Sequence, residues 1–149
     1  MRRELAGGFE LDDDRDRIDV DAVQAFISRE SYWGRGRTRE RVQQTIDGST
    51  RVMGLYHRAE QVGFARAVSD GVTVGYLADV YVLPAYRGRG LGLELVREMI
   101  EGATGADAAN VRWLLHTADA QGLYKKLGFA EGLPTYPLME RGRGYDARP

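Results

Sequence analysis

Apolar residues at helical spacing predict two short helices in the first third of the chain. In the first helix Val23, Phe26 and Ile27 would share one face, and the side chain of Asp19 could cap the N-terminus. Thr38 could cap the second helix in the same way, and Gly48 would end it. Gly34 and Gly36 separate the two helices, and Val42 and Ile46 are the apolar positions of the second.

The periodicity then changes to the alternation typical of strands. Residues 51–57, 61–68 and 72–83 read as three consecutive antiparallel strands joined by tight turns. An amphipathic helix follows over residues 91–101, then a short apolar strand over 111–116 and a helix over 119–128. With two strands expected ahead of the first helices, this order predicts an α+β or mixed α/β fold, with helices packed on the faces of one sheet.

Composition narrows the class of protein. The chain has 149 residues, 43% hydrophobic and 29% charged, with a net charge of −1, a pI near 6.1 and no cysteine. These values predict one soluble domain over residues 1–149, with a core at about 8–140 and a flexible tail from 141. They argue against a nucleic-acid or membrane partner. Without an apolar run suited to a signal peptide or a membrane span, a cytoplasmic location is expected.

Two segments carry opposite local charge. Residues 12–21 hold six aspartates against two arginines, and residues 31–41 hold four arginines against one glutamate. Such segments are usually solvated surface, although they can also steer a charged substrate.

The stretch Tyr86–Gly92, "YRGRGLG", is the main chemical signal, and we call it the glycine loop. It lies between a predicted strand and a predicted helix, where unpaired N–H groups and the helix dipole favour an anion. Gly88, Gly90 and Gly92 would allow close backbone approach, and Arg87 and Arg89 would add charge for phosphate oxygens.

Several ligands compete for such a loop. The mononucleotide pattern Gly-x-x-x-x-Gly-Lys-Ser/Thr is absent. The dinucleotide pattern is also a poor match, because the next strand ends in His116 and Thr117 instead of an acidic residue. The pyrophosphate of coenzyme A remains, as does a tight turn that binds nothing.

Two motifs together extend this interpretation. The first, "VYVLPAYRGRGLGLELV", resembles the central signature of the GNAT superfamily of acyl-CoA-dependent N-acyltransferases. Its pattern Gln/Arg-x-x-Gly-x-Gly/Ala is met by Arg87, Gly90 and Gly92. The second, "ADAQGLYKKLGFAE", resembles the segment Ala-x-x-Leu-Tyr-x-x-x-Gly-Phe of the same superfamily, and the resemblance covers roughly residues 8–131.

The resemblance implies an acyltransferase with the GNAT fold that uses acetyl-CoA as co-substrate and no metal. Acetyl would pass to a small-molecule or peptide amine by direct attack, through a tetrahedral intermediate, and a homodimer is among the expected assemblies. The backbone of the strand predicted at 72–83 would bind pantetheine and supply an oxyanion donor. The positions that the resemblance assigns to the cofactor are Val80, Tyr81, Val82, Arg87, Gly88, Arg89, Gly90, Leu91, Gly92 and Thr117, the last standing where relatives often have Asn.

The resemblance also suggests catalytic groups. Tyr124 matches the tyrosine that protonates the departing CoA sulfur, although it could also simply pack on the sheet. Relatives place a Glu or His base on the strand where this chain has residues 76–78, "YLA". Asp79 is the nearby carboxylate, suited either to amine recognition and base work or to a structural hydrogen-bonding role. His116 or a chain of water molecules could replace it.

The acceptor pocket and the function itself leave further alternatives. Tyr32 and Trp33 lie between the first two predicted helices, where they could cover an amine acceptor or pack those helices onto the sheet. The main alternative to an enzyme is an acyl-CoA-binding sensor that has lost turnover, and a nucleic-acid module is a weaker one. The pattern does not identify the acceptor, the acyl chain or the oligomeric state.

Overall fold

The computed structural model of the chain describes residues 1–102, 110–132 and 137–141. Its described part contains one six-stranded sheet in the order β1-β2-β3-β4-β5-β6. Every neighbouring pair is antiparallel except β5 and β6, which are parallel. The elements are β1 (Arg2–Leu5), β2 (Phe9–Asp12), η1 (Arg15–Arg17), α1 (Val20–Arg29), α2 (Arg39–Asp47), β3 (Arg51–His57), β4 (Glu60–Ser69), β5 (Val74–Val82), η2 (Pro84–Tyr86), α3 (Leu91–Glu101), β6 (Arg112–Leu114) and α4 (Gln121–Lys125).

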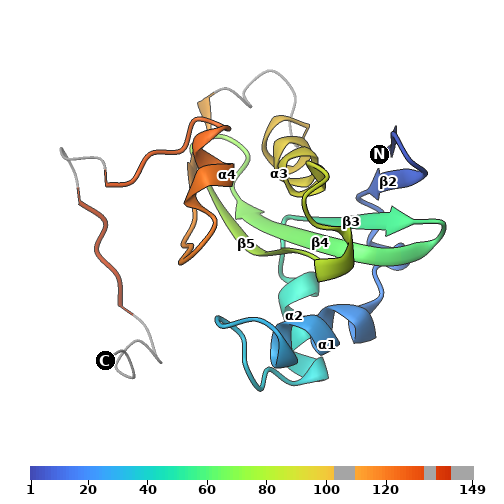
Figure 1. Cartoon of the computed structure of the whole chain (residues 1–149). Helices are drawn as coiled ribbons and strands as arrows, with labels where there is room; N and C mark the ends of the chain where they lie inside the picture. The colour runs from blue at the N-terminus through green and yellow to red at the C-terminus, as the bar shows by residue number, and fades with distance from the viewer. Residues whose placement is uncertain (103–109, 133–136, 142–149) are drawn as a thin grey trace.

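Helices cover both faces of this sheet. Figure 1 shows α3 on one side of the strands and α1 with α2 on the other. One apolar cluster joins α3 and Tyr124 of α4 to the sheet, and a second joins α1 and α2 to Val52, Phe64 and Tyr81. The expected mixed fold, with a mostly antiparallel sheet between two helical layers, is therefore confirmed.

The local signals placed the first helices well. Asp19 accepts a hydrogen bond from the backbone N–H of Ala22 at the start of α1, and Thr38 accepts one from Arg41 at the start of α2. Gly48 ends α2 as expected. The three antiparallel strands and the helix at 91–101 are also present within two residues of their predicted limits.

The last strand and helix are shorter than predicted. β6 covers only Arg112–Leu114, because these three residues pair with β5 and the chain then leaves the sheet, so His116 and Thr117 lie in the following loop. After α4 the chain continues to Gly128 with hydrogen bonds that span three residues, and the positive φ of Gly128 (85°) ends this turn. Of the predicted tail, residues 142–149 lie outside the described part of the chain.

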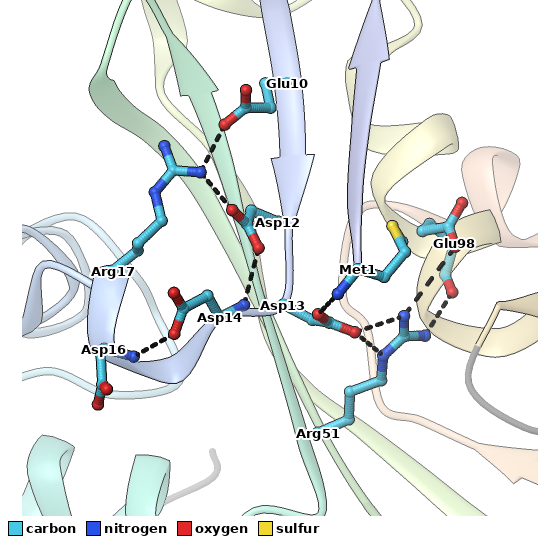
Figure 2. A network of polar contacts seen from close by, with 9 residues as sticks. All are labelled: Met1, Glu10, Asp12, Asp13, Asp14, Asp16, Arg17, Arg51 and Glu98. Atoms are coloured by element: carbon cyan, nitrogen blue, oxygen red, sulfur yellow. Dashed lines mark hydrogen bonds and ion pairs between the residues drawn. The ribbon is translucent and has the colours of Figure 1, made fainter.

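The acidic segment at 12–21 is largely paired rather than free. Asp12 lies in an ion pair with Arg17, and Asp13 contacts both the N-terminal amine and Arg51 (Figure 2). Arg51 also donates to the backbone carbonyl of Glu98 in α3 (2.7 Å), so this network ties β2 and β3 to a helix. Burial alone would raise the pKa of both carboxyls, but the backbone N–H of Asp14 and then Arg17 lower the pKa of Asp12, and the N-terminal amine and then Arg51 lower that of Asp13. The charged side chains of this network therefore mainly stabilise the fold.

Candidate active site

β5 leaves part of its backbone without a strand partner on one side. Its pairing with β6 ends at Tyr76 and Leu114, whereas β5 itself continues to Val82. In the described part of the chain, no strand therefore pairs with residues 77–82 on the side of β6. We call this stretch the open edge. Unpaired backbone N–H and C=O groups on such an edge can bind an extended amide-containing chain, as another strand would.

A β-bulge distorts β5 at the centre of the open edge. Phe64 pairs with Tyr81 and Arg66 with Ala78, so Ala65 lies opposite both Asp79 and Val80. Asp79 has a φ of 52°, a left-handed conformation that few non-glycine residues adopt. Strain of this kind persists only where surrounding contacts hold it.

Those contacts surround the carboxylate of Asp79, whose side chain is only 3% exposed. It accepts hydrogen bonds from Arg66 Nε (2.6 Å), Arg37 Nη1 (2.7 Å) and Trp33 Nε1 (2.9 Å). Two cations and an indole therefore occupy its oxygens. This arrangement favours the structural role over the role of proton acceptor for Asp79, and it identifies two arginines that sequence reasoning missed. A buried aspartate in an apolar strand was the available signal, since such a charge needs a cation partner.

The loop between α1 and α2 reaches across to α4 through Tyr32. The hydroxyl of Tyr32 accepts a hydrogen bond from the backbone N–H of Ala118 (2.7 Å), and its ring meets that of Trp33 edge to face at 5.0 Å. The two side chains remain 50% and 39% exposed. Tyr32 and Trp33 thus connect Asp79 on β5 to the segment before α4, and both offer aromatic surface to a ligand.

Tyr124 packs within α4 but keeps its hydroxyl available. The residue is 9% exposed, and its ring lies edge to face with Phe129 at 5.7 Å. Among the described residues no hydrogen-bond partner of this hydroxyl is found. Burial, followed by the nearby Tyr32 and Asp119, raises the pKa of Tyr124 to about 12. The phenol is thus a neutral donor at physiological pH.

The glycine loop leads from β5 into α3. Gly88 and Gly90 both have a φ of 75°, and Gly90 is the N-cap of α3 without a side-chain cap. A Cβ on either glycine would meet nothing within 4 Å, so backbone conformation is the reason for glycine there. Gly92 differs, because a Cβ on it would lie 3.1 Å from Leu123 of α4. This close approach brings α4 beside the start of α3.

The other residues predicted to bind the cofactor have definite partners or surroundings. Arg87 Nε donates to the carbonyl of Val82 (2.8 Å) and ties the loop to the end of β5, whereas Arg89 is exposed and has no partner in the described part of the chain. The side chain of Leu91 is buried in the core, so its predicted contact with the cofactor would have to come from its backbone N–H at the start of α3. The Thr117 hydroxyl accepts from the N–H of Ala120 (3.0 Å), so it orders the turn before α4.

A well-defined hollow in the described part of the chain lies away from the glycine loop. It has a volume of about 500 Å³ and runs along α1 beside the start of β4. Phe26, Gln61 and Tyr81 are among its lining residues, and neither Tyr124 nor the loop contributes to it. We do not assign the cofactor to this hollow, because it lacks the anion-binding backbone that the loop provides.

Comparison with known proteins identifies the family. The model of the acetyltransferase (GNAT) family matches residues 20–129, about three quarters of the chain. This chain belongs to the GNAT acetyltransferase family. A GNAT-family crystal structure from Xanthomonas campestris pv. campestris is 34% identical and covers 90% of this chain and 92% of its own, with a TM-score of 0.81. The GNAT resemblance and the acyltransferase class expected from the two motifs are confirmed at the level of the family.

Two curated relatives add names of proteins in the GNAT family. A protein of Gibberella zeae, provisionally named an acetyltransferase, is 31% identical in an alignment 117 positions long that covers 64% of this chain and 66% of the relative. Serotonin N-acetyltransferase 2 of rice, a chloroplastic protein, is 30% identical in an alignment 130 positions long that covers 84% of this chain and 63% of the relative. The matches thus span slightly less than two thirds of these relatives. No helix among the described residues is long and apolar enough to cross a membrane.

Proposed function

We propose that this protein transfers the acetyl group of acetyl-CoA to a primary amine by direct attack on the thioester. The observation that carries the proposal is the meeting of three features. The start of α3, the end of β5 and α4 converge where a Cβ on Gly92 would lie 3.1 Å from Leu123 and 3.9 Å from Val82. The glycine loop, the end of the open edge and α4, the helix that carries Tyr124, therefore lie around one place.

Each feature has a role in this proposal. The N–H groups of the glycine loop and the side chain of Arg89 bind the pyrophosphate, and Arg87 holds the loop against β5. The backbone of Val80, Tyr81 and Val82 binds pantetheine, and an N–H freed at the bulge stabilises the oxyanion of the tetrahedral intermediate. Tyr124 donates a hydrogen bond to the departing sulfur.

The acceptor amine enters beside Tyr32 and Trp33. Their exposed aromatic surface suits an amine that carries an apolar or aromatic body. The name of the rice relative makes serotonin a reasonable first acceptor, and spermidine and a short peptide with a free N-terminus represent other amine classes.

Acetyl-CoA is expected to raise the melting temperature of the protein. A ligand that binds only the folded state adds about 2.7 kcal/mol to stability at a hundredfold excess over its dissociation constant. A thermal-shift titration would measure this effect, with NADH and ATP as controls for other phosphate ligands. No shift at millimolar acetyl-CoA would contradict the proposal. A shift without thiol release for any of the three amines would instead support an acyl-CoA sensor.

Gly90→Ala is expected to weaken acetyl-CoA binding beyond its effect on stability. A φ of 75° costs an alanine about 1–2 kcal/mol. Gly71→Ala is a matched control, because Gly71 also has a φ of 75° and no atom within 4 Å of an added Cβ, but it lies in the turn between β4 and β5. Both variants should unfold at similar lower temperatures, and calorimetric titration should detect weaker binding only for Gly90→Ala. Equal affinities would argue against the loop as the pyrophosphate site.

A further inference from the structure

Three titratable side chains form a hydrogen-bonded chain beside the open edge. The hydroxyl of Tyr76 on β5 lies 2.5 Å from Nδ1 of His116, and Nε2 of His116 lies 2.9 Å from a carboxylate oxygen of Glu140. The three residues come from β5, from the loop after β6 and from the segment 137–141. Only their folding brings them together, since Tyr76 and His116 are 40 residues apart.

The order of these three groups sets the direction in which protons are donated along their hydrogen bonds. A carboxylate only accepts hydrogen bonds, so Glu140 fixes the proton of a neutral His116 on Nε2. Nδ1 is then an acceptor and receives the hydroxyl proton of Tyr76. The phenolic oxygen is thereby made more basic toward a proton from another donor, by the same logic that activates a hydroxyl in a hydroxyl–histidine–carboxylate triad.

These three hydrogen-bonded side chains lie at the point where β5 and β6 separate. Tyr76 and Leu114 are their last paired residues, and the open edge begins with the next residue of β5. Ala118, two residues after His116, donates to the hydroxyl of Tyr32, and Tyr32 is close enough to Tyr124 to help raise its pKa. Tyr76 and His116 are therefore on the same side of the molecule as the proposed acceptor entrance.

The nearest alternative base on β5 is already engaged. Asp79 binds Arg37, Arg66 and the indole of Trp33, so its oxygens are directed to donors of the protein itself. His116 in contrast is 39% exposed in its side chain and can exchange a proton with solvent.

We propose that Tyr76, His116 and Glu140 form a proton relay that deprotonates the acceptor amine. The ammonium of the acceptor gives one proton to the oxygen of Tyr76 as the hydroxyl proton of Tyr76 moves to Nδ1 of His116. The resulting imidazolium is stabilised by Glu140 and later loses its proton to water. The neutral amine then forms the N–C bond, and collapse of the tetrahedral intermediate breaks the C–S bond. The nitrogen gives up its second proton to water as the departing thiolate takes one up, so this part of the reaction is neutral in protons. Tyr76 and His116 carry the proton, and Glu140 is a positioning residue.

This inference rests on the proposed acetyl transfer, so its test uses both turnover and a measurement on the protein alone. Serotonin, spermidine and a peptide with a free N-terminus serve separately as acceptors, with thiol release as the assay. His116→Gln should lower kcat about 100-fold, the lower end of the contribution of a general base, with little change in the KM for acetyl-CoA. His57→Gln is the matched control, because His57 is the other histidine of the chain and packs against Phe9 and Tyr86 instead of Tyr76 and Glu140, so it should keep kcat and its pH profile even if the KM for acetyl-CoA changes.

Two further readouts separate a relay from a merely structural role. The fall of kcat/KM toward acid pH in the wild type should flatten in His116→Gln, because the group that must be deprotonated is gone. Nitrogen-15 NMR of the imidazole should show the Nε2–H form in the wild type, with a shift of the Nδ1 signal in Tyr76→Phe. Glu140→Gln should lower kcat by a smaller factor.

The outcomes distinguish the relay from the function on which it rests. If the wild type is active and His116→Gln keeps its kcat and pH profile, the relay alone is overturned. An NMR spectrum of the wild type with the imidazole proton on Nδ1 would have the same consequence. An inactive wild type with all three amines would overturn the proposed transfer, and the relay with it.

Discussion

Tyr124→Phe is expected to lower kcat for acetyl transfer about 100-fold, the lower end of the contribution of a general acid. The phenol is neutral at physiological pH because burial, Tyr32 and Asp119 raise the pKa of Tyr124 to about 12. A phenol with this pKa is a weaker acid than a thiol with a pKa near 8.5, so it stabilises the departing thiolate mainly by a hydrogen bond. Steady-state thiol release would measure the loss, and the KM for acetyl-CoA should change little.

The same variant should keep its stability at neutral pH. The hydroxyl of Tyr124 makes no hydrogen bond within the described part of the chain, and phenylalanine can keep the ring contact with Phe129. Tyr56→Phe is the matched control with the opposite pattern. The hydroxyl of Tyr56 donates to the carbonyl of Arg17 (2.9 Å), so Tyr56→Phe should lower stability by about 1 kcal/mol and leave kcat unchanged. A Tyr124→Phe enzyme with wild-type kcat would remove Tyr124 from the mechanism.

The pKa of Tyr124 also predicts how stability depends on pH. Because the folded pKa of about 12 lies above the unfolded value near 10, the unfolded state loses its proton first as the pH rises. The stabilisation by the buried neutral phenol is complete below pH 10 and is lost between about pH 10 and 12. In Tyr124→Phe this part of the alkaline loss of stability should disappear from denaturant titrations.

Local sequence signals were sufficient for most of the fold. Helix caps such as Asp19 and Thr38 act within a few residues, so the sequence shows them directly. The strand at 51–57 was also predicted, although five consecutive residues of β3 are buried and burial does not alternate along it. The limits of β6 were not predictable in this way. Residues 111–116 are apolar enough for a full strand, but only three of them find a partner on β5 before the chains diverge.

The site was predictable where glycine or a motif marks it and hidden where it depends on distant contacts. Gly88 and Gly90 reveal a backbone conformation in the sequence itself. The contact between Tyr32 and Ala118 spans 86 residues and that between Trp33 and Asp79 spans 46, and no periodicity records such pairs. The residues that bind acetyl-CoA and amine remain predictions, which the variants described here would test.

Asp79→Asn is expected to destabilise the protein by about 3 kcal/mol, as when one partner of a buried ion pair is removed. Asparagine keeps the shape of the side chain and tolerates a positive φ, so the change isolates the charge. Without it, Arg37 and Arg66, whose side chains are 21% and 15% exposed, lose their carboxylate. At roughly 2–4 °C per kcal/mol for a domain of this size, the melting temperature should fall by about 6–12 °C.

Asp21→Asn is the control for this prediction, because Asp21 pairs with Arg39 at the surface, where the two side chains are 77% and 58% exposed. Such an exposed pair contributes little, so the melting temperature should hardly change. Asp79→Asn should also raise the KM for the amine, since Trp33 loses the charged acceptor that holds its loop over β5. A variant that keeps its melting temperature but loses kcat would reverse the assignment. Asp79 would then be the base, and its contacts with the two arginines would be incidental to the fold.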